Sequence, residues 1–476
     1  MSWTLPGRPW VDFEWLPEIL YSWIFGRWGM AGLWALKAAL LSAAGLAFLK
    51  LLDAKGAPKP VWPGAFLLWA AAIAHQSDLR PDAISLLAFT AQLAYLENGG
   101  ALRQGAPVFP PLDAELIGFA AFYALWADCH AGLALGLLAL GLHFFWHALL
   151  REKEMARRSG LRLAAGLLGS ACGPYGLALW RVIIQHAGAS AGLRQTVLEW
   201  RSPPLARPFW LLAALAASVA ARRFFAKTPG RKGGSREGID LSLMILLGLL
   251  TAESRRLEPY FAVAALAALG AWLAEDAALL SWARRPFVFP ALLAGFLAFA
   301  AATTRSPWLS GRSAKPFDPV FVCRRTAEWL VRNETELGRL PAFHLWGWGG
   351  YLGWRLPGFK IFADGRYIFH ELNLETSEAA RSPEAWGRFL DRWRPQLALL
   401  PNLPLSFRGG PFYRAFMPRK DWALVYWDSK ALVFVRRGAV TKPWLRRHEY
   451  RELRDDPRRH AGEIAQAYSA IPFSLK

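Results

Sequence analysis

The chain has 476 residues, of which 54% are apolar and 19% charged, and it carries 56 Lys and Arg against 36 Asp and Glu, a formal net charge of +20. The apolar residues gather in runs of about fifteen to twenty-five, which is typical of a membrane protein with several spans. Basic residues lie in short connections between these runs, so the positive charge indicates a bilayer and not a nucleic-acid partner. Cys129, Cys172 and Cys323 are too few, and odd in number, for a disulfide framework, and we expect them to be small buried residues.

The N-terminal segment, residues 1–28, precedes the first long apolar run. Glu14 and Glu18 lie one helical turn apart and share a face, while tryptophans and isoleucines trace an apolar face. Such an amphipathic helix would lie along a membrane surface. Two interpretations of its acids stay open: a solvated acidic face, or Asp12 or Glu14 acting in a cavity as a base or metal ligand.

About ten apolar segments are candidate membrane spans. They cover residues 29–52, 61–75, 82–97, 114–127, 131–150, 161–180, 208–225, 239–254, 257–280 and 286–303. The connections 151–162 and 222–236 are strongly basic, and the positive-inside rule places them in the cytoplasm. Residues 1–28 and everything after about residue 304 would then lie outside the cytoplasm. Because two external ends and an even number of spans are an uncommon arrangement, we expect a further helix before residue 1.

From residue 304 onward the composition becomes that of a soluble α/β domain. The patterns predict helices over 324–337 and 377–392, short buried strands over 360–363 and 397–400, and a hairpin over 422–437 that turns at 428–430. The charged tail after Lys442 predicts a surface helix or partial disorder. The fold class is therefore mainly α: a polytopic helical bundle over 29–303 with an extracytoplasmic α/β domain over 304–476.

Polar residues concentrate in the connections predicted to lie outside the cytoplasm. They occupy residues 9–20, 74–82, 125–132, 171–177, 198–204 and 253–261. This one-sided distribution favours a cavity that opens outward. Asp128 and His130 flank Cys129 at the start of a span, where the acid could cap the helix. The alternative is that His130 binds phosphate or relays a proton.

Three external arginines run against the charge bias of membrane proteins. They are Arg201, Arg255 and Arg256. A guanidinium group suits a phosphate or pyrophosphate held close to the membrane. Alternatively, Glu199 or Glu253 could neutralise these arginines in structural ion pairs.

The stretch WGWGGYLGW, residues 346–354, combines flat aromatic rings with glycines, and FADGR follows it. Proteins bind sugars with flat aromatic faces and with charged groups at the edge of the sugar ring. We therefore predict an acceptor or sugar site built from two tryptophans, a tyrosine, an acidic residue and a basic residue. These are Trp346, Trp348, Tyr351, Asp364 and Arg366. The alternative is that the indoles only serve packing.

The order of these motifs resembles a group of bacterial polytopic proteins related to the GT-C class of glycosyltransferases, over nearly the whole chain. The motifs are GRPWVDFEWLPE, LWADCHAGLALG, GPYGL, LEWRSP, SRRLEPYFA, WGWGGYLGWRLP, FADGR and WALVYWDSKALVFVR. The resemblance implies a multispan enzyme of the bacterial cytoplasmic membrane. It would move a sugar from a polyprenyl phosphate carrier to an envelope glycan or other acceptor on the outer face.

In that class an acid of the first outer loop serves as base or metal ligand. The resemblance therefore implies catalytic roles for Asp12 and Glu14, with a divalent cation as a further expectation. The chain departs from the group at Phe13, where relatives often have histidine, and at Asp128 and Gly173, where they have asparagine. A noncatalytic glycan-binding or envelope assembly protein is the alternative function, and a transporter is a third.

Overall fold

The computed structural model describes residues 2–74, 78–100, 112–188, 197–205, 207–225, 234–275, 322–402 and 416–453, with scattered residues between 192 and 298 and residues 474–475. The chain divides into two compact units. The helical unit comprises Val11–Ser310, and the C-terminal unit comprises Gly311–Lys476 together with Met1–Trp10. The described residues are mostly helical, with one small sheet of more than two strands in the C-terminal unit.

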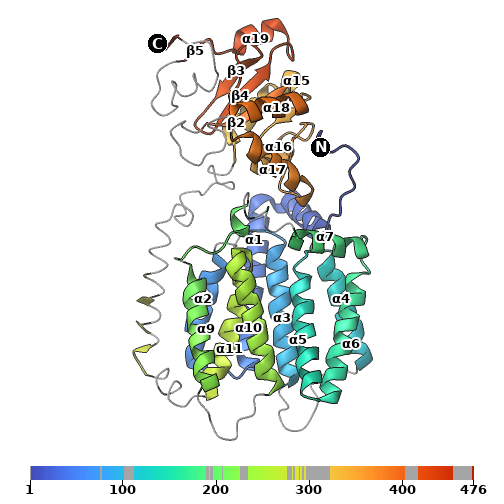
Figure 1. Cartoon of the computed structure of the whole chain (residues 1–476), viewed down its shortest axis with the longest axis vertical. Helices are drawn as coiled ribbons and strands as arrows, with labels where there is room; N and C mark the ends of the chain where they lie inside the picture. Colours follow the sequence, from blue (N-terminus) through green and yellow to red (C-terminus); the bar gives the residue numbers. More distant parts are fainter. Residues whose placement is uncertain are drawn as a thin grey trace. The chain divides into compact units, whose positions relative to one another are not determined.

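The helical unit is a bundle of helices that run side by side (Figure 1). They are α1 (Trp15–Ala54), α2 (Trp62–Ile73), α3 (Asp82–Gly100), α4 (Leu112–Ala127), α5 (Leu133–Leu149), α6 (Lys153–Ser170), α7 (Leu177–Gly188), α9 (Pro208–Phe225), α10 (Ser235–Glu253) and α11 (Glu258–Glu275). Short 3-10 turns are η1 (Lys59–Val61), η3 (Leu198–Trp200) and η4 (Arg255–Leu257). Within α1, Gly29 adopts a positive φ of 57°, which divides a short N-terminal helix from a long second part.

One predicted span is wrong. The segment 161–180 is not continuous, because α6 ends at Ser170 and α7 begins at Leu177. Pro174 disfavours a continuing helix, and Gly176 adopts a positive φ of 48° in the turn between the two helices. Correspondingly, most of the basic segment 151–162, predicted to be a connection, forms the first turns of α6.

Within the described residues, two helices are long and apolar enough to cross a membrane, Trp15–Ala54 and Arg255–Glu275. Two shorter apolar helices are Leu133–Leu149 and Pro208–Arg222. The predicted total of about ten spans therefore stays a prediction. The segment 286–303 falls largely outside the described residues.

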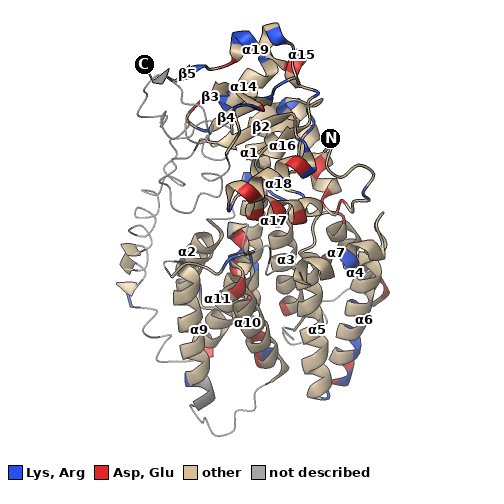
Figure 2. Cartoon of the chain, turned by 45° about the horizontal axis from the view of Figure 1, so that its top comes forward, with Lys and Arg blue, Asp and Glu red and all other residues tan. Residues whose placement is uncertain are grey.

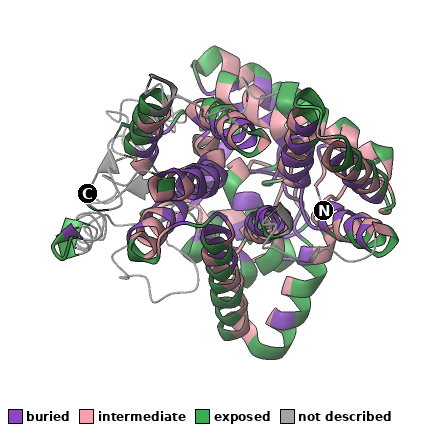
Figure 3. Ribbon diagram, turned by 90° about the horizontal axis from the view of Figure 1, so that it is seen from below, coloured by how far each residue is buried: buried purple, intermediate pink, exposed green. Residues whose placement is uncertain are grey.

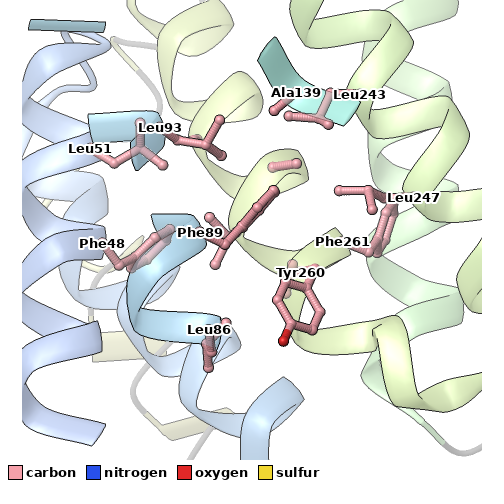
Figure 4. Packing of buried hydrophobic residues seen from close by; sticks show 14 of the residues in the cluster. Phe48, Leu51, Leu86, Phe89, Leu93, Ala139, Leu243, Leu247, Tyr260 and Phe261 are labelled. Carbon is pink, nitrogen blue, oxygen red and sulfur yellow. The ribbon is translucent and has the colours of Figure 1, made fainter. Parts of the chain in front are cut away.

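The core of the helical unit joins helices that are distant in sequence. Phe48 of α1, Phe89 of α3 and Tyr260 of α11 lie together, and the rings of Phe89 and Tyr260 meet edge to face at 5.4 Å (Figure 4). Helix α11 carries buried residues along most of its length. Figure 3 shows buried residues facing the inside of the bundle and exposed residues on its outer surface.

Several charged groups are also buried in the bundle. Lys55 Nζ lies 2.5 Å from both Glu97 Oε1 and Asp240 Oδ1, so one ammonium joins the ends of α1 and α3 to the start of α10. The Arg162 guanidinium lies 2.6 Å from Glu115 Oε1 and ties α6 to α4. Such pairs are tolerated inside a protein only when each charge is matched.

The C-terminal unit contains a four-stranded sheet in the order β1-β2-β4-β3. The strands are β1 (Ala342–Phe343), β2 (Leu397–Pro401), β3 (Trp422–Trp427) and β4 (Ala431–Arg436). β1 and β2 are parallel, and the other pairs are antiparallel. The predicted hairpin over 422–437 and the predicted strand over 397–400 are both confirmed.

Two helical layers cover the sheet. Along β4, Leu432 and Phe434 pack into one hydrophobic cluster, whereas Val433 and Val435 pack into the other, as strand alternation requires. The first cluster includes residues of α17 (His370–Ala379) and α18 (Pro383–Trp393). The second includes residues of α14 (Arg324–Arg332), α15 (Glu334–Leu337), α16 (Gly349–Arg355) and α19 (Lys442–His448).

Two predictions for this unit are corrected. Of the predicted strand over 360–363, residues 361–363 are buried and Lys360 is exposed, and the segment forms no strand; the edge of the sheet is β1 instead. The helix predicted over 377–392 is interrupted, because Pro383 starts α18 and Ser382 caps it by accepting a hydrogen bond from the Ala385 amide. The N-terminal residues also belong to this unit, since Trp3 contacts Phe362 and Trp393 edge to face.

Candidate functional site

Polar side chains from four parts of the sequence meet at one end of the helical unit. We call this group the polar cluster; it consists of Glu14, Asp82, His130, Arg256 and Tyr260. Helices α1, α3, α5 and α11 all begin close to these residues. Helix N-termini carry partial positive charge and unpaired N–H groups, so this end of the bundle suits an anionic ligand.

The His130 ring is held in one orientation. The Gly132 amide donates a hydrogen bond to Nδ1 at 3.0 Å, so Nδ1 carries no proton in the neutral ring. The Trp126 indole donates to Ser85 Oγ at 2.7 Å, and the Ser85 hydroxyl in turn lies 2.8 Å from Nδ1, where it donates. The proton of the neutral imidazole is thereby assigned to Nε2.

The protonation state of His130 follows from its burial. The side chain is 8% exposed, and burial lowers the pKa of His130 to about 4, although the nearby Asp82 carboxylate opposes this shift. The ring is therefore neutral at pH 7. Its Nε2 lies 3.3 Å from Arg256 Nη2 and 3.7 Å from Glu14 Oε1.

The carboxyl group of Glu14 has a raised pKa. Burial raises the pKa of Glu14 from 4.5 to about 7; the positive charge of Arg256 opposes this shift, and the carboxylates of Glu18, Asp12 and Asp82 add to it. The Glu14 side chain keeps 32% of its surface exposed. A carboxylate with a pKa near neutrality and access to solvent can exchange protons at physiological pH.

The other contacts of the polar cluster involve Tyr260, Asp82 and Arg256. The Tyr260 hydroxyl donates a hydrogen bond to Asp82 Oδ1 at 2.7 Å. The Arg256 guanidinium lies over the Trp200 ring, 5.8 Å from its centroid. Arg256 Nη2 lies within hydrogen-bond distance of His130 Nε2, and Glu14 Oε1 lies 3.7 Å from the same nitrogen, so the three groups face one another.

The other two predicted phosphate ligands lie next to the polar cluster. Arg255 donates its backbone amide to the Arg201 carbonyl at 2.9 Å, which brings η4 beside the segment after η3. Arg201 Nε donates to the Arg194 carbonyl. Glu199, predicted as a possible partner of these arginines, lies 2.7 Å from Arg80 Nη1. Burial favours the neutral acid, but the positive charges of Arg80 and Arg256 outweigh this effect and lower the pKa of Glu199.

Asp12 and Asp128 have local structural contacts. Asp12 Oδ1 accepts a hydrogen bond from the Glu14 amide at 3.3 Å, so Asp12 shapes the turn that presents Glu14. The Asp128 carboxylate lies against Gly173, where a Cβ atom would meet Asp128 Oδ1 at 2.5 Å. Asp128 and Gly173 are two positions at which this chain departs from the group that it resembles, and they are therefore in contact. Phe13 meets the His186 ring edge to face at 5.8 Å.

The predicted sugar site in the C-terminal unit is not one open face. Trp348 is 7% exposed and lies in one core cluster, whereas Trp346 packs against the cluster on the other side of the sheet. Gly349 permits this packing, because a Cβ atom there would lie 1.9 Å from the Ala363 carbonyl oxygen. The burial of Trp348 favours the packing interpretation of the indoles.

The three other residues of that predicted site also have structural partners. Arg366 forms two contacts with Asp364, at 2.8 Å and 2.7 Å, and its guanidinium lies 4.8 Å from the centroid of Trp10. Tyr351 is partly buried and lies beside Trp354. The structure therefore leaves Asp364 and Arg366 paired with each other.

Sequence reasoning missed four residues around the polar cluster, namely Asp82, Ser85, Trp126 and Tyr260. Three of them lie within the polar stretches 74–82, 125–132 and 253–261, but nothing in the sequence distinguishes them from neighbours. In the part of the chain that the structure describes, no three His, Cys, Asp or Glu side chains are grouped to hold a metal ion. The expected divalent cation stays a prediction.

No protein-family model matches this chain, and no curated protein matches it either. The chemistry of the polar cluster is therefore inferred from the arrangement of its own side chains.

Proposed function

We propose that the protein is a multispan membrane glycosyltransferase, similar to the GT-C class, that moves a sugar from a polyprenyl phosphate carrier to an acceptor on the outer face of the bacterial cytoplasmic membrane. One observation carries the proposal: a carboxylate with a pKa near 7, Glu14, lies beside the donors of His130 and Arg256 where several helices begin. A transferase that uses a phosphate leaving group needs such a base and such donors.

A membrane location is supported by the surface of the helical unit. Large apolar side chains are exposed on several helices, among them Ile117 of α4, Leu168 of α6, Leu211 of α9 and Leu249 of α10. Charged groups such as Lys55 are buried instead. Exposed leucines with buried ion pairs suit a bundle surrounded by lipid, where every buried polar group needs a partner.

The donor phosphate would occupy the space next to Arg256 and His130. A phosphate oxygen there would accept hydrogen bonds from Arg256 Nη2 and from His130 Nε2, which lie 3.3 Å apart. Neutral His130 contributes a donor without a second positive charge. Arg201 and Arg255, which the sequence also predicts as phosphate ligands, would add positive potential from the adjacent turns.

Glu14 would act as the base. The acceptor hydroxyl oxygen attacks the anomeric carbon of the sugar and forms the new C–O bond, while the bond from that carbon to the phosphate oxygen breaks. The electron pair leaves with the polyprenyl phosphate, and the hydroxyl proton passes to Glu14. A pKa near 7 places Glu14 where it can accept this proton at neutral pH.

The test compares Glu14→Gln with Glu18→Gln in the purified full chain. Glu18 lies one turn further along α1 and is exposed, so it controls for a change of charge in the same helix. A panel of polyprenyl-phosphate hexoses is supplied with an envelope extract as acceptor, and release of polyprenyl phosphate is measured. We expect Glu14→Gln to lower the rate by about 100-fold or more and Glu18→Gln to change it less than about twofold. Equal rates in both variants would refute the assignment, and carrier binding without any turnover would favour the noncatalytic alternative.

A further inference from the structure

The two helical layers of the C-terminal unit differ in charge. Helices α14 and α19 carry mainly basic side chains: Arg324, Arg325, Arg332, Lys442, Arg446 and Arg447. The only acid on these two helices is Glu328, which pairs with Arg324 at 2.8 Å; α15 of the same layer adds Glu334 and Glu336. On the other side of the sheet, α17 and α18 carry mainly acids: Glu371, Glu375, Glu378, Glu384 and Asp391. Figure 2 shows the blue of α19 and the red of α17.

We call α14 and α19 together the basic face. Within the described residues Arg325, Arg332, Arg446 and Arg447 are exposed and have no salt bridge. Like charges on one small surface repel each other and lower the stability of the fold. Within the described residues, no salt bridge to an acid offsets this repulsion at the four arginines.

Aromatic rings lie between these cations. Trp329 of α14 stacks on Tyr426 at 4.9 Å and lies beside Trp444 of α19 at 6.4 Å, so the two helices form one continuous surface. Arg325 and Arg332 lie on the Trp329 side of α14, at helical spacing from it. Burial raises the pKa of Tyr426 above its usual value, and the charges of Arg325 and Arg332 oppose that shift, which places both guanidinium groups near this ring.

We propose that the basic face binds an anionic polysaccharide, whose carboxylates pair with the guanidinium groups and whose sugar rings lie against the exposed parts of the aromatic side chains. All the central cations are arginines, and a guanidinium matches a carboxylate with two parallel hydrogen bonds. This inference stands independently of the glycosyltransferase proposal, because it uses no residue of the polar cluster.

A polymer fits the basic face better than a single small anion. One exposed ion pair contributes little to affinity, so a lone carboxylate would not be retained. A repeating anion engages several arginines at once, and each further pair then forms within the same complex. A bilayer fits less well, since exposed large apolar side chains on α14, α16 and α19 are limited to Val331 and Trp354 within the described residues.

The test measures binding of polygalacturonate to the purified full chain in a neutral detergent, with uncharged dextran as the reference polymer. We expect binding of polygalacturonate alone, and a loss of affinity as salt rises because exposed pairs are screened. The double variant Arg325→Gln, Arg332→Gln should weaken binding about tenfold. The matched variant Arg381→Gln, Arg388→Gln removes two exposed arginines from the opposite layer and should change the affinity less than about twofold.

Three results would overturn the proposal. The first is equal binding of dextran or no binding of polygalacturonate at low salt. The second is an equal loss of affinity in both double variants, which would indicate a response to total charge. The third is a preference for vesicles of anionic phospholipid over polygalacturonate, abolished by Arg325→Gln with Arg332→Gln, which would assign the face to the membrane surface.

Discussion

Replacing Glu14 by glutamine should make the protein more stable at high pH and leave its stability unchanged at low pH. Burial raises the pKa of Glu14 from 4.5 to about 7, so the folded protein holds a proton that the unfolded chain releases between these values. The stability of the wild type therefore falls as pH rises from about 4.5 to about 7 and is level above that. Glutamine does not titrate, so the variant does not undergo this loss.

The size of the effect follows from the shift. About 2.5 pKa units correspond to about 3.4 kcal/mol at 1.36 kcal/mol per unit. Because 32% of the side chain is exposed, solvent screens part of this cost, and we expect a gain of about 1 to 2 kcal/mol for Glu14→Gln above pH 7.5. The assay is denaturant unfolding of the purified full chain at a series of pH values from 4.5 to about 8.5.

Glu18→Gln provides the control, since this exposed neighbour should give a small difference at every pH. The reasoning about Glu14 would be refuted if Glu14→Gln destabilised the protein above pH 7, or if its effect did not change between pH 5 and pH 8. The same variant should be inactive although it is more stable. Lower activity together with higher stability is expected when the folded protein buries a carboxylate that it needs for catalysis.

Three further predictions concern groups that hold the fold and the site. Ser85→Ala should remove one of the two contacts that orient the imidazole of the polar cluster and lower transfer about tenfold, while the ¹⁵N chemical shifts still show the proton on Nε2, because the Gly132 amide still donates to Nδ1. Lys55→Met should destabilise the protein by about 3 to 5 kcal/mol in urea unfolding, because the buried Asp240 loses its partner and the buried Glu97 keeps only Arg236, whereas exposed Lys50→Ala should cost less than about 0.5 kcal/mol. Gly349→Ala should cost about 3 kcal/mol because of the collision with the carbonyl oxygen, while Gly350→Ala, with open space around it, should not destabilise.

The sequence predicted correctly those helices and strands that are determined by the hydrophobic pattern of neighbouring residues. The helix over 208–225 and the hairpin over 422–437 agree with the structure, because each has one clear periodicity and clear ends. The convergence of several polar stretches, which the sequence predicts to lie on one side of a membrane, also followed from a simple principle. If connections alternate between the two ends of a bundle, alternate polar connections must meet, as the contacts of Glu14, Asp82 and His130 illustrate.

Long-range packing could not be predicted in this way. The interruption of 161–180 depends on a proline and a glycine with positive φ inside an apolar run that looks continuous. Trp348 resembles a surface residue among glycines, yet its neighbours in space come from elsewhere in the chain and bury it. Ser85 is an ordinary small residue of an apolar helix, and only the position of Trp126 and His130 gives it a role.

The assignment of the phosphate to Arg256 and His130 can be tested directly by photo-crosslinking. The full chain is incubated with a short polyprenyl phosphate that carries a diazirine next to the phosphate, and the labelled peptides are identified by mass spectrometry. We predict label in the peptides that contain Glu14, His130 and Arg256, and its loss in Arg256→Gln. Label concentrated around Lys55 and Arg236 at the other end of the bundle, or a pattern that Arg256→Gln leaves unchanged, would contradict the account.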